Sequence, residues 1–322
     1  MKNKDYFSEF ELIDLIRKKA KISKSSAVRG IGDDAAVINY DKKNYMLFTT
    51  DSLVENVHFS LNYFSPKQVG MKAVEQNVSD IAAMGGIPKF ALVSLGLKKS
   101  TNKKFVESLY DGILKAASKY KIEAIGGNIT SSKDNFITIF LAGFVEKKKI
   151  CLRSAAKKGD LVFCTGNVGK SAAGLELLKS KKTGESVKSH IEPKSRLALS
   201  QKLVRIGINS MIDVSDGVAP EISHICQESK VGAVIYADKL PISESTIEDA
   251  KKSRKNPVDF ALYGGEDFEL IFTADKSRLS KLKNLDVSVI GEIIDKKYGV
   301  KVVKGGKEIK IKKGFDHFAA GN

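Results

Sequence analysis

The sequence predicts a mixed α/β protein, built as one large domain or two ordinary ones. The chain has 322 residues, 42% of them hydrophobic, which is enough for cores of ordinary size. Some stretches have apolar residues at helical spacing and others read as short strands, so both kinds of element are expected. We place a domain boundary in the stretch 151–160, which divides the chain into domains at residues 1–150 and 151–322.

In the first half, helices are expected to alternate with strands. The best-marked helix begins at Pro66 and ends at Gly85 and Gly86, because proline suits the first helical turn and paired glycines interrupt a helix. A second glycine pair, Gly126 and Gly127, is expected to form a turn where backbone can approach a ligand closely. The expected helices span 7–18, 66–84 and 102–120, and the expected strands span 36–40, 45–50, 91–97 and 136–145.

The second half contains a turn that imitates a phosphate-binding loop. A strand at 161–165 leads into Gly166-Asn167-Val168-Gly169-Lys170-Ser171 and then into a helix through residue 178. A true P-loop has the pattern Gly-x-x-x-x-Gly-Lys-Ser/Thr, which requires a glycine five positions before Gly169, and Cys164 stands at that position. We therefore interpret the segment as an ordinary turn and helix start. Further helices are expected at 193–206 and 218–229, a glycine turn between strands at 260–272, and short strands at 287–311.

The composition excludes several classes of protein. The net charge is +16, but most lysines lie in short runs with little aromatic interleaving, which favours a solvated surface over a nucleic-acid groove. No run of about 18 apolar residues occurs and the N-terminus lacks an apolar signal segment, so we expect no membrane association. Three widely spaced cysteines suit buried, reduced thiols and a cytoplasmic location.

Acidic residues occur in stretches that contain no lysine or arginine. Asp33 and Asp34 are adjacent in a glycine-containing turn, and no basic residue lies between positions 31 and 41 of this lysine-rich chain. Carboxylates that avoid cations are expected to serve something other than salt bridges. Carboxylate oxygens supplied by several loops are the ligands that Mg²⁺ requires where it also holds phosphate oxygens. The other basic-free stretches are 44–66, 73–88, 206–229 and 256–275.

Each candidate residue also has an ordinary interpretation. His58 follows a strand, and a lone histidine in an apolar context is usually a hydrogen-bonded core residue. Asp80 lies beside the apolar stripe of its helix, where an exposed carboxylate is the simple alternative. Asp213 and Ser215 alternate with apolar neighbours and would share one face of a strand, whereas Ser215 or Asp216 could merely cap the next helix.

The order of these motifs along nearly the whole chain resembles the thiamine-monophosphate kinase family. That family phosphorylates thiamine monophosphate with ATP and Mg²⁺, in a superfamily shared with aminoimidazole ribonucleotide synthetase, selenophosphate synthetase and a hydrogenase maturation factor. The residues that carry the resemblance are Gly32-Asp33-Asp34-Ala35-Ala36, Thr50-Asp51, Asn56-Val57-His58-Phe59, the stretch from Asn77 to Gly85, Gly126-Gly127-Asn128, Asp213-Val214-Ser215-Asp216-Gly217, Gly264-Gly265-Glu266-Asp267 and Gly314-Phe315-Asp316-His317-Phe318.

The resemblance implies a fold and a set of ligands. The implied fold is α/β in two domains, with an N-terminal sheet that pairs with that of a second subunit, giving a homodimer, and a ferredoxin-like C-terminal domain. Mg²⁺ would be held by Asp34, Thr49, Thr50, Asp51, Asp80, Asn128, Asp213 and Asp216. ATP would be held by Tyr110, Gly127, Asn128, Arg153 and Ser215, and thiamine monophosphate by His58, Glu266 and Phe315.

The chemistry that the resemblance implies needs no catalytic side chain. The second pKa of a phosphate monoester is about 6, so the attacking oxygen is largely ionised at neutral pH and no general base is required. The obstacle is repulsion between two anions, which several Mg²⁺ ions can remove during direct in-line transfer. A missing P-loop and a missing nucleophile are then expected.

Two departures and two rivals complete the interpretation. The family normally has aspartate at the position of Asn128, and tyrosine or tryptophan at that of Phe315. A selenophosphate synthetase would need a reactive cysteine near its N-terminus, but the first cysteine is Cys151. A basic nucleotide-binding protein without catalysis would not consume ATP in response to thiamine monophosphate.

Overall fold

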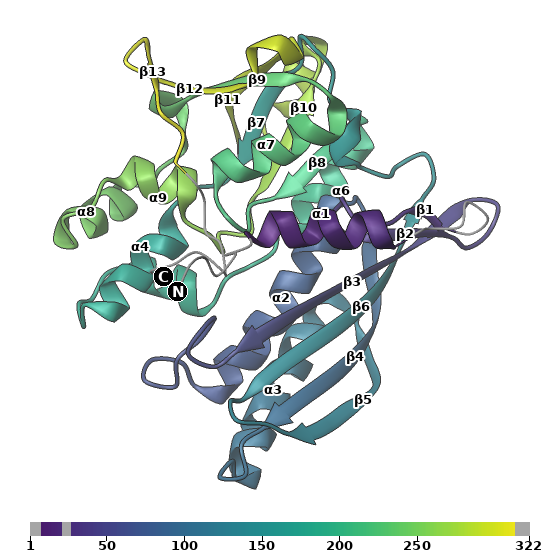
Figure 1. Ribbon diagram of the computed structural model, residues 1–322, viewed down its shortest axis with the longest axis vertical. Coiled ribbons are helices and arrows are strands. Elements are labelled where there is room, and N and C mark those ends of the chain that lie inside the picture. Colours follow the sequence, from purple (N-terminus) through teal and green to yellow (C-terminus); the bar gives the residue numbers. More distant parts are fainter. Residues whose placement is uncertain (1–7, 21–26, 313–322) are drawn as a thin grey trace, which may run out of the picture.

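The chain forms two mixed sheets, one in each half (Figure 1). This computed structural model describes residues 8–20 and 27–312. The N-terminal sheet has the strand order β1-β2-β3-β6-β4-β5, and the C-terminal sheet has the order β13-β12-β9-β11-β7-β10-β8. The strands of the N-terminal sheet are β1 (Ala27–Arg29), β2 (Ala36–Asn39), β3 (Asn44–Val54), β4 (Ile87–Leu97), β5 (Glu123–Ser131) and β6 (Phe136–Glu146).

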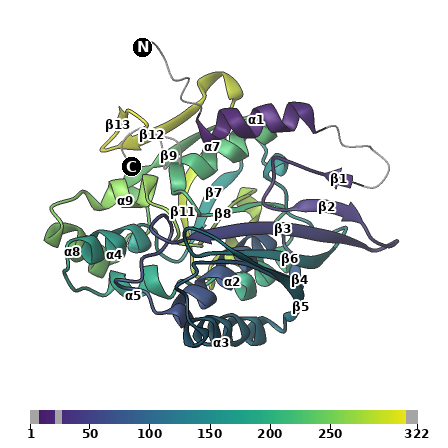
Figure 2. The same ribbon diagram turned by 60° about the horizontal axis from the view of Figure 1, so that its bottom comes forward.

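Two helices, α2 (Pro66–Ala83) and α3 (Lys103–Tyr120), cover one face of the N-terminal sheet (Figure 2). A capping box between Ser65 and Gln68 starts α2, and Pro66 occupies its first turn. The two helices pack closely at Gly112 because this residue has no side chain. A Cβ atom there would lie 1.9 Å from the Lys67 carbonyl oxygen. The result is that α2 is buried on nearly every side.

Alternation along β3 decides which of its side chains face α2. Thr49 lies on the same face as the buried Leu47 and Leu53, so Asp51 also points toward the helices. Thr50 is exposed and lies on the opposite face, together with Phe48. A shift of one residue would exchange these two sets, so the apolar pattern of β3 fixes where its carboxylate points.

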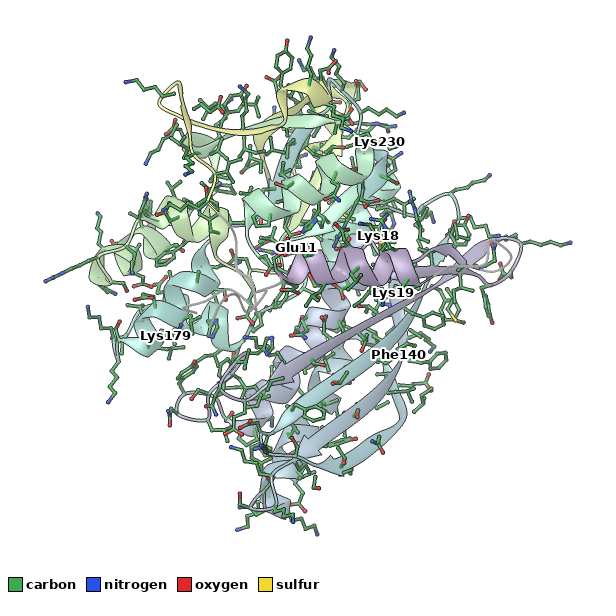
Figure 3. The ribbon with its side chains drawn as sticks, in the orientation of Figure 1. Glu11, Lys18, Lys19, Phe140, Lys179 and Lys230 are labelled. Atoms are coloured by element: carbon green, nitrogen blue, oxygen red, sulfur yellow. The ribbon has the colours of Figure 1, made fainter. Side chains whose placement is uncertain are left out.

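The opposite face of the N-terminal sheet carries no helix in the described part of the chain and combines partly exposed aromatic side chains with hydroxyl side chains such as Ser52 and Thr138. The rings of Phe48 on β3 and Phe140 on β6 stack at a centroid distance of 5.3 Å, and Figure 3 labels Phe140. Leu92 on β4 lies directly opposite Phe140 and is 40% exposed. We call this surface the open face. An exposed apolar group of this kind is typical of an interaction site.

The C-terminal sheet is antiparallel except where β12 runs parallel to β9. Its strands are β7 (Leu161–Thr165), β8 (Ser210–Asp213), β9 (Gly232–Tyr236), β10 (Leu270–Ala274), β11 (Val287–Ile294), β12 (Val300–Lys304) and β13 (Lys307–Ile309). The helices of this half are α4 (Lys170–Lys179), α5 (Ser186–Ile191), α6 (Leu197–Ile206), α7 (Val218–Ser229), α8 (Glu244–Lys252), α9 (Pro257–Tyr263) and α10 (Leu279–Leu282).

Helix α2 joins the two halves. Its C-terminal end contributes Ala83 to a core that also contains Leu203 of α6 and Phe272 of β10. The Ser200 hydroxyl donates to the Ala82 carbonyl, 2.5 Å away. The N-terminal helix α1 (Glu9–Lys19) lies beside α7, to which the Arg17–Glu228 ion pair of 2.7 Å connects it (Figure 2). Side chains from both halves can therefore meet along α2.

The structure corrects two expectations. The segment with Gly126 and Gly127 is the edge strand β5, parallel to β4, instead of a turn. At Gly127 a Cβ atom would lie 1.8 Å from the Val93 carbonyl oxygen, so the need for glycine comes from strand packing. The expectation of a turn between strands at 260–272 is also wrong, because α9 precedes this turn and only β10 follows it.

Candidate active site

Three carboxylates from distant parts of the chain converge where the two halves meet. Asp34 follows the turn before β2, Asp80 lies on α2, and Asp213 ends β8. An oxygen from each lies within 4.8 Å of an oxygen from the other two. The interpretation of Asp80 as an exposed helix carboxylate is wrong, because its side chain accepts a hydrogen bond from the Thr49 hydroxyl beneath the sheet.

Neighbouring side chains hold this group in place. Asp51 lies beside Asp80 and shares a hydrogen bond with it. The Ser79 hydroxyl donates to Asp213 Oδ2 at 2.6 Å, so consecutive residues of α2 contact both ends of the group. Asp33 is adjacent to Asp34 and is likewise withdrawn from solvent. We call Asp33, Asp34, Asp51, Asp80 and Asp213 the acidic cluster.

The acidic cluster is electrostatically frustrated. Burial, followed by the neighbouring charges of Asp51, Asp213 and Asp34, raises the pKa of Asp80 well above its usual range. Burial and the Asp34 charge raise the pKa of Asp213 in the same direction. Burial raises the pKa of Asp33 to about 7, with a further contribution from Asp34. Carboxylates arranged in this way are stabilised in their ionised form by a bound cation.

One arginine partly compensates the cluster. Arg153 Nη2 lies 2.7 Å from Asp34 Oδ1, and the Arg153 amide donates to Asp33 Oδ1 at 3.2 Å. The guanidinium side chain is 18% exposed, so one side of it can reach a ligand. The basic-free stretches of the sequence could not reveal this contact, because Arg153 lies more than a hundred positions from Asp34.

The donor set fits a hard divalent cation. Asp34 Oδ2 is buried and has no hydrogen-bond partner among the described residues, although a buried carboxylate oxygen normally has one. The surrounding donors are carboxylate oxygens and hydroxyls, which suit Mg²⁺ and do not suit a soft metal. The residues present therefore fit the predicted Mg²⁺.

The segment after β8 is tied down by a buried glutamate that the sequence did not single out. Glu221, in the first turn of α7, accepts hydrogen bonds from the Ser215 hydroxyl at 3.1 Å and from the Asp216 amide at 3.0 Å. Gly217 has a φ of +105°, and a Cβ there would lie 2.7 Å from the Leu262 carbonyl oxygen. Ser215 and Asp216 are thus positioned next to Asp213.

A second charged group lies further along α2. Lys72 Nζ is 2.7 Å from Glu266 Oε1, and His190 Nδ1 of α5 is 3.3 Å from Glu266 Oε2. His58 lies close enough to contribute to the electrostatics of Glu266, so the structure brings these two predicted residues together. His58 Nδ1 accepts the Val54 amide at 3.1 Å, which gives the ring a hydrogen bond of its own.

Four predicted residues lie apart from the acidic cluster or beyond the described chain. Asn128 lies on β5, three strand spacings from β3 and thus about 14 Å across the sheet. The side chain of Thr50 lies on the open face, away from Asp51. Tyr110 lies on α3 and packs against the N-terminal core. Phe315 falls outside the described residues.

The structure supports the interpretation of residues 166–171 as an ordinary helix start. The amide of Ser171, at the beginning of α4, donates to Asp267 Oδ1 at 2.9 Å, and the amide of Gly169 donates to Asp267 Oδ2. A carboxylate from the same chain thus occupies the position that a P-loop offers to phosphate.

Two family models match the chain. The model described as AIR synthase related protein, N-terminal domain, matches residues 32–145, and the corresponding C-terminal domain matches residues 157–304. The described part of the chain has no helix that is long and apolar enough to cross a membrane.

Thiamine-monophosphate kinases are close relatives in sequence and in structure. The chain is 39% identical over 316 residues to the kinase of Aquifex aeolicus, covering 96% of this chain and 98% of that protein. It is 37% identical to the kinase of Bacillus subtilis, covering 96% and 99% of the two chains. The solved structure of AaThiL complexed with AMPPCP and TMP aligns with a TM-score of 0.86 and 38% identity, covering 98% of this chain and 99% of that one.

Proposed function

This chain belongs to the thiamine-monophosphate kinase family, and we propose that it transfers a phosphoryl group from ATP to thiamine monophosphate, giving thiamine diphosphate. The observation that carries the proposal is the acidic cluster, with its orphaned Asp34 oxygen and the Arg153 guanidinium beside Asp34. The free, buried cysteines of the chain support a cytoplasmic location. The boundary at residues 150 and 151 remains a prediction.

Among the metal ligands that we propose, Asp34, Asp51, Asp80 and Asp213 belong to the acidic cluster, whereas the side chains of Thr50 and Asn128 lie apart from it. When bound, Mg²⁺ would supply positive charge that neutralises and aligns the phosphate oxygens of both substrates. The raised pKa values of Asp80 and Asp213 support this role, because uncompensated buried carboxylates favour a cation. The proposed ligands are Asp34, Thr49, Thr50, Asp51, Asp80, Asn128, Asp213 and Asp216.

Helix α2 separates the two ends of the proposed acceptor. Lys72 and Asp80 are eight residues apart on it, which corresponds to about 12 Å along the helix axis. We place the phosphate of thiamine monophosphate toward Asp80, and its organic part toward Glu266 and His58, with Phe315 as a third contact. We place ATP on the side of Arg153 and Ser215, with Tyr110, Gly127 and Asn128 as further contacts.

The side chains of this site would bind and orient the substrates without exchanging a proton with them. The accepting oxygen belongs to a phosphate monoester that is largely ionised near neutral pH, so it needs no base. Arg153 provides a guanidinium that can bind phosphate oxygens, and the Ser215 hydroxyl is held in place by Glu221. Catalysis would then rest on positioning and electrostatics.

We further propose a homodimer formed through the open face. The stacked Phe48 and Phe140 rings and the 40% exposed Leu92 supply the apolar surface that such an interface needs. Asn128 also belongs to this face and lies about 14 Å from β3, so a second copy could bring it toward another site. The ferredoxin-like description of the C-terminal half is part of the proposal, supported by its largely antiparallel sheet.

The test is to incubate the purified protein with ATP, Mg²⁺ and thiamine monophosphate and to measure thiamine diphosphate. We expect turnover that disappears when Mg²⁺ is chelated. Free thiamine is the matched control, because its uncharged hydroxyl would need a base that this site does not place at the acceptor position. Absence of thiamine diphosphate would refute the proposed function, and comparable turnover of free thiamine would refute direct transfer without a base.

A further inference from the structure

Lys72 is a fully buried lysine with one carboxylate partner. Its side chain has no exposed surface, whereas lysine is rarely buried unless it is paired. Nζ lies 2.7 Å from Glu266 Oε1 and 3.4 Å from the carbonyl oxygen of His58. The ammonium also lies 5.2 Å from the centre of the Phe64 ring, which favours a cation. The surroundings of Lys72 are thus built for a charged ammonium.

The ion pair between Lys72 and Glu266 is asymmetric. The Glu266 side chain is 26% exposed, so the carboxylate can be reached from outside while the ammonium cannot. Lys72 contacts Oε1 and therefore fixes the orientation of the whole carboxylate. A ligand that approaches from outside meets a carboxylate that is already oriented and already desolvated on its inner side.

The backbone of Glu266 indicates that its position matters. Glu266 has a φ of +66°, which is unfavourable for a residue with a side chain. Its amide donates to the Ser215 carbonyl at 2.7 Å, so the turn that carries Glu266 is fastened to the segment that carries Ser215 and Asp216. Glu266 is thereby connected to the acidic cluster in two ways. It pairs with Lys72 on α2, the helix that also carries Asp80, and its amide is hydrogen-bonded to the segment that follows Asp213.

We propose that Lys72 is a positioning residue for the acceptor substrate, because its enclosed ammonium holds the Glu266 carboxylate ionised and oriented toward the organic part of that substrate. The inference rests on the proposed function, since it takes thiamine monophosphate as the acceptor. Lys72 itself does not contact the substrate in this arrangement. Its contribution is to keep the carboxylate an acceptor of hydrogen bonds, as an amine-bearing or cationic heterocycle requires.

The charges around Glu266 give the proposal a pH signature. Burial has the largest single effect on the pKa of Glu266 and would raise it, but the charge and hydrogen bond of Lys72, together with His190 and His58, lower the pKa. The other titratable groups that face Glu266 are His190 on α5, His58 on the loop before α2, and Tyr63. Burial, and then the Lys72 charge, lower the pKa of His190 to about 4, so this ring is neutral near pH 7.

The experiment compares Lys72→Met, Glu266→Gln and the double variant with the wild-type protein. The KM for thiamine monophosphate, the KM for ATP and kcat are measured between pH 6 and pH 9. Binding of thiamine monophosphate without ATP is followed by calorimetry. Lys67→Met serves as a matched control, because Lys67 lies on the same helix with an exposed side chain. Thermal unfolding of each variant reports whether it folds.

We expect Lys72→Met to raise the KM for thiamine monophosphate by about tenfold or more, which corresponds to about 1.4 kcal/mol, while the KM for ATP stays near the wild-type value. The defect should shrink as the pH rises, because Glu266 without Lys72 has a raised pKa and regains its charge at high pH. In the Glu266→Gln background, Lys72→Met should add little, since the partner through which Lys72 acts is gone. Lys67→Met should leave all of these constants unchanged.

Three results would overturn the inference. Equal increases in both KM values would indicate a general structural role, and so would a KM defect independent of pH. Additive effects of the two substitutions would show that Lys72 does not act through Glu266. If Lys72→Met fails to fold, the double variant, which removes both charges, is compared with Glu266→Gln, and a further rise in the KM for thiamine monophosphate refutes the role. Failure of the proposed function is distinct, because the wild-type protein itself would then yield no thiamine diphosphate.

Discussion

The acidic cluster and the Lys72–Glu266 pair lie along the same helix but are electrostatic opposites. In the cluster, oxygens of Asp34, Asp80 and Asp213 lie within 4.8 Å of one another, and one guanidinium pairs with Asp34. In the pair, a single carboxylate is matched by a single enclosed ammonium at 2.7 Å. The pKa of Asp80 is raised, whereas that of Glu266 is lowered, although both side chains are largely withdrawn from solvent.

The difference supports the proposal that one helix serves two parts of a substrate. A group of like charges is unstable until a cation arrives, so it suits a site where metal ions and phosphates assemble. A compensated pair is stable without a ligand and can be preorganised for hydrogen bonding. Charge balance, more than the number of acidic residues, therefore distinguishes the metal end of the site from the organic end.

The largest effect should come from removing a charge from the acidic cluster. Asp80→Asn and Asp51→Asn should each lower turnover by orders of magnitude while the protein stays folded, because the substitution keeps the shape of the side chain. Glu248→Gln, which changes an exposed carboxylate on α8, is the control and should have normal activity. If Asp80→Asn retains near-normal activity across Mg²⁺ concentrations, Asp80 is not a functional metal ligand.

At Arg153 we expect about a tenfold change in the affinity for Mg²⁺, and the change should be a gain. Arg153→Met removes the guanidinium that lies 2.7 Å from Asp34, so Mg²⁺ should bind about tenfold more tightly in the absence of ATP. ATP should bind more weakly, because the guanidinium is also the proposed phosphate contact. Calorimetric titration with each ligand measures both changes. Weaker binding of Mg²⁺ would mean that Arg153 supports the metal site instead of competing with it.

A smaller effect is expected at Asn128, where the family normally has aspartate. Asn128→Asp should lower the Mg²⁺ concentration that gives half-maximal activity, because it restores a negative charge. The exception is that Asp134 already supplies the missing charge. In that case Asp134→Asn should lower activity far more in the wild-type protein than in the Asn128→Asp variant. An unchanged Mg²⁺ dependence in Asn128→Asp and Asp134→Asn would show that residue 128 does not control a functional metal.

Apart from these effects on activity and ligand binding, an effect on stability in acid is expected next to the compensated pair. Burial lowers the pKa of His190 to about 4, so the unfolded chain binds protons more readily below pH 6.5. The neutral ring contributes its full stability above pH 6.5. The free energy of unfolding then falls by up to about 3 kcal/mol as the pH is lowered from 6.5 through 4. His190→Gln should therefore flatten the dependence of the unfolding free energy on pH between 7 and 4. An unchanged slope would contradict the assignment.

The sequence predicted the carboxylates better than their counter-ions. The absence of basic residues near Asp34, Asp51, Asp80 and Asp213 was visible in the sequence, and the structure brings these carboxylates together, although Asp34 also pairs with Arg153. Lys72 and Arg153 were not linked to their partners, since each contact joins segments far apart in the chain. Such contacts depend on tertiary packing, which no local spacing records.

Backbone features of the fold were predicted unevenly for a similar reason. The helix at 66–84 was marked by Pro66 and the glycines that follow it, and α2 ends at Ala83. Strand β5 was missed because Gly126 and Gly127 weaken strand propensity, while the close approach of Val93 that requires glycine is a contact between strands. Turn chemistry can be read locally, whereas strand packing cannot.

In the proposed site, the acidic cluster binds divalent cations and the Lys72–Glu266 pair does not. The most direct test is calorimetric titration of metal-free protein with Mg²⁺, comparing the wild-type protein with Asp213→Asn and Glu266→Gln. We predict that Asp213→Asn weakens Mg²⁺ binding strongly and that Glu266→Gln binds Mg²⁺ like the wild-type protein. Equal weakening in both variants, or undiminished binding in Asp213→Asn, would contradict the division of the site into a metal end and an organic end.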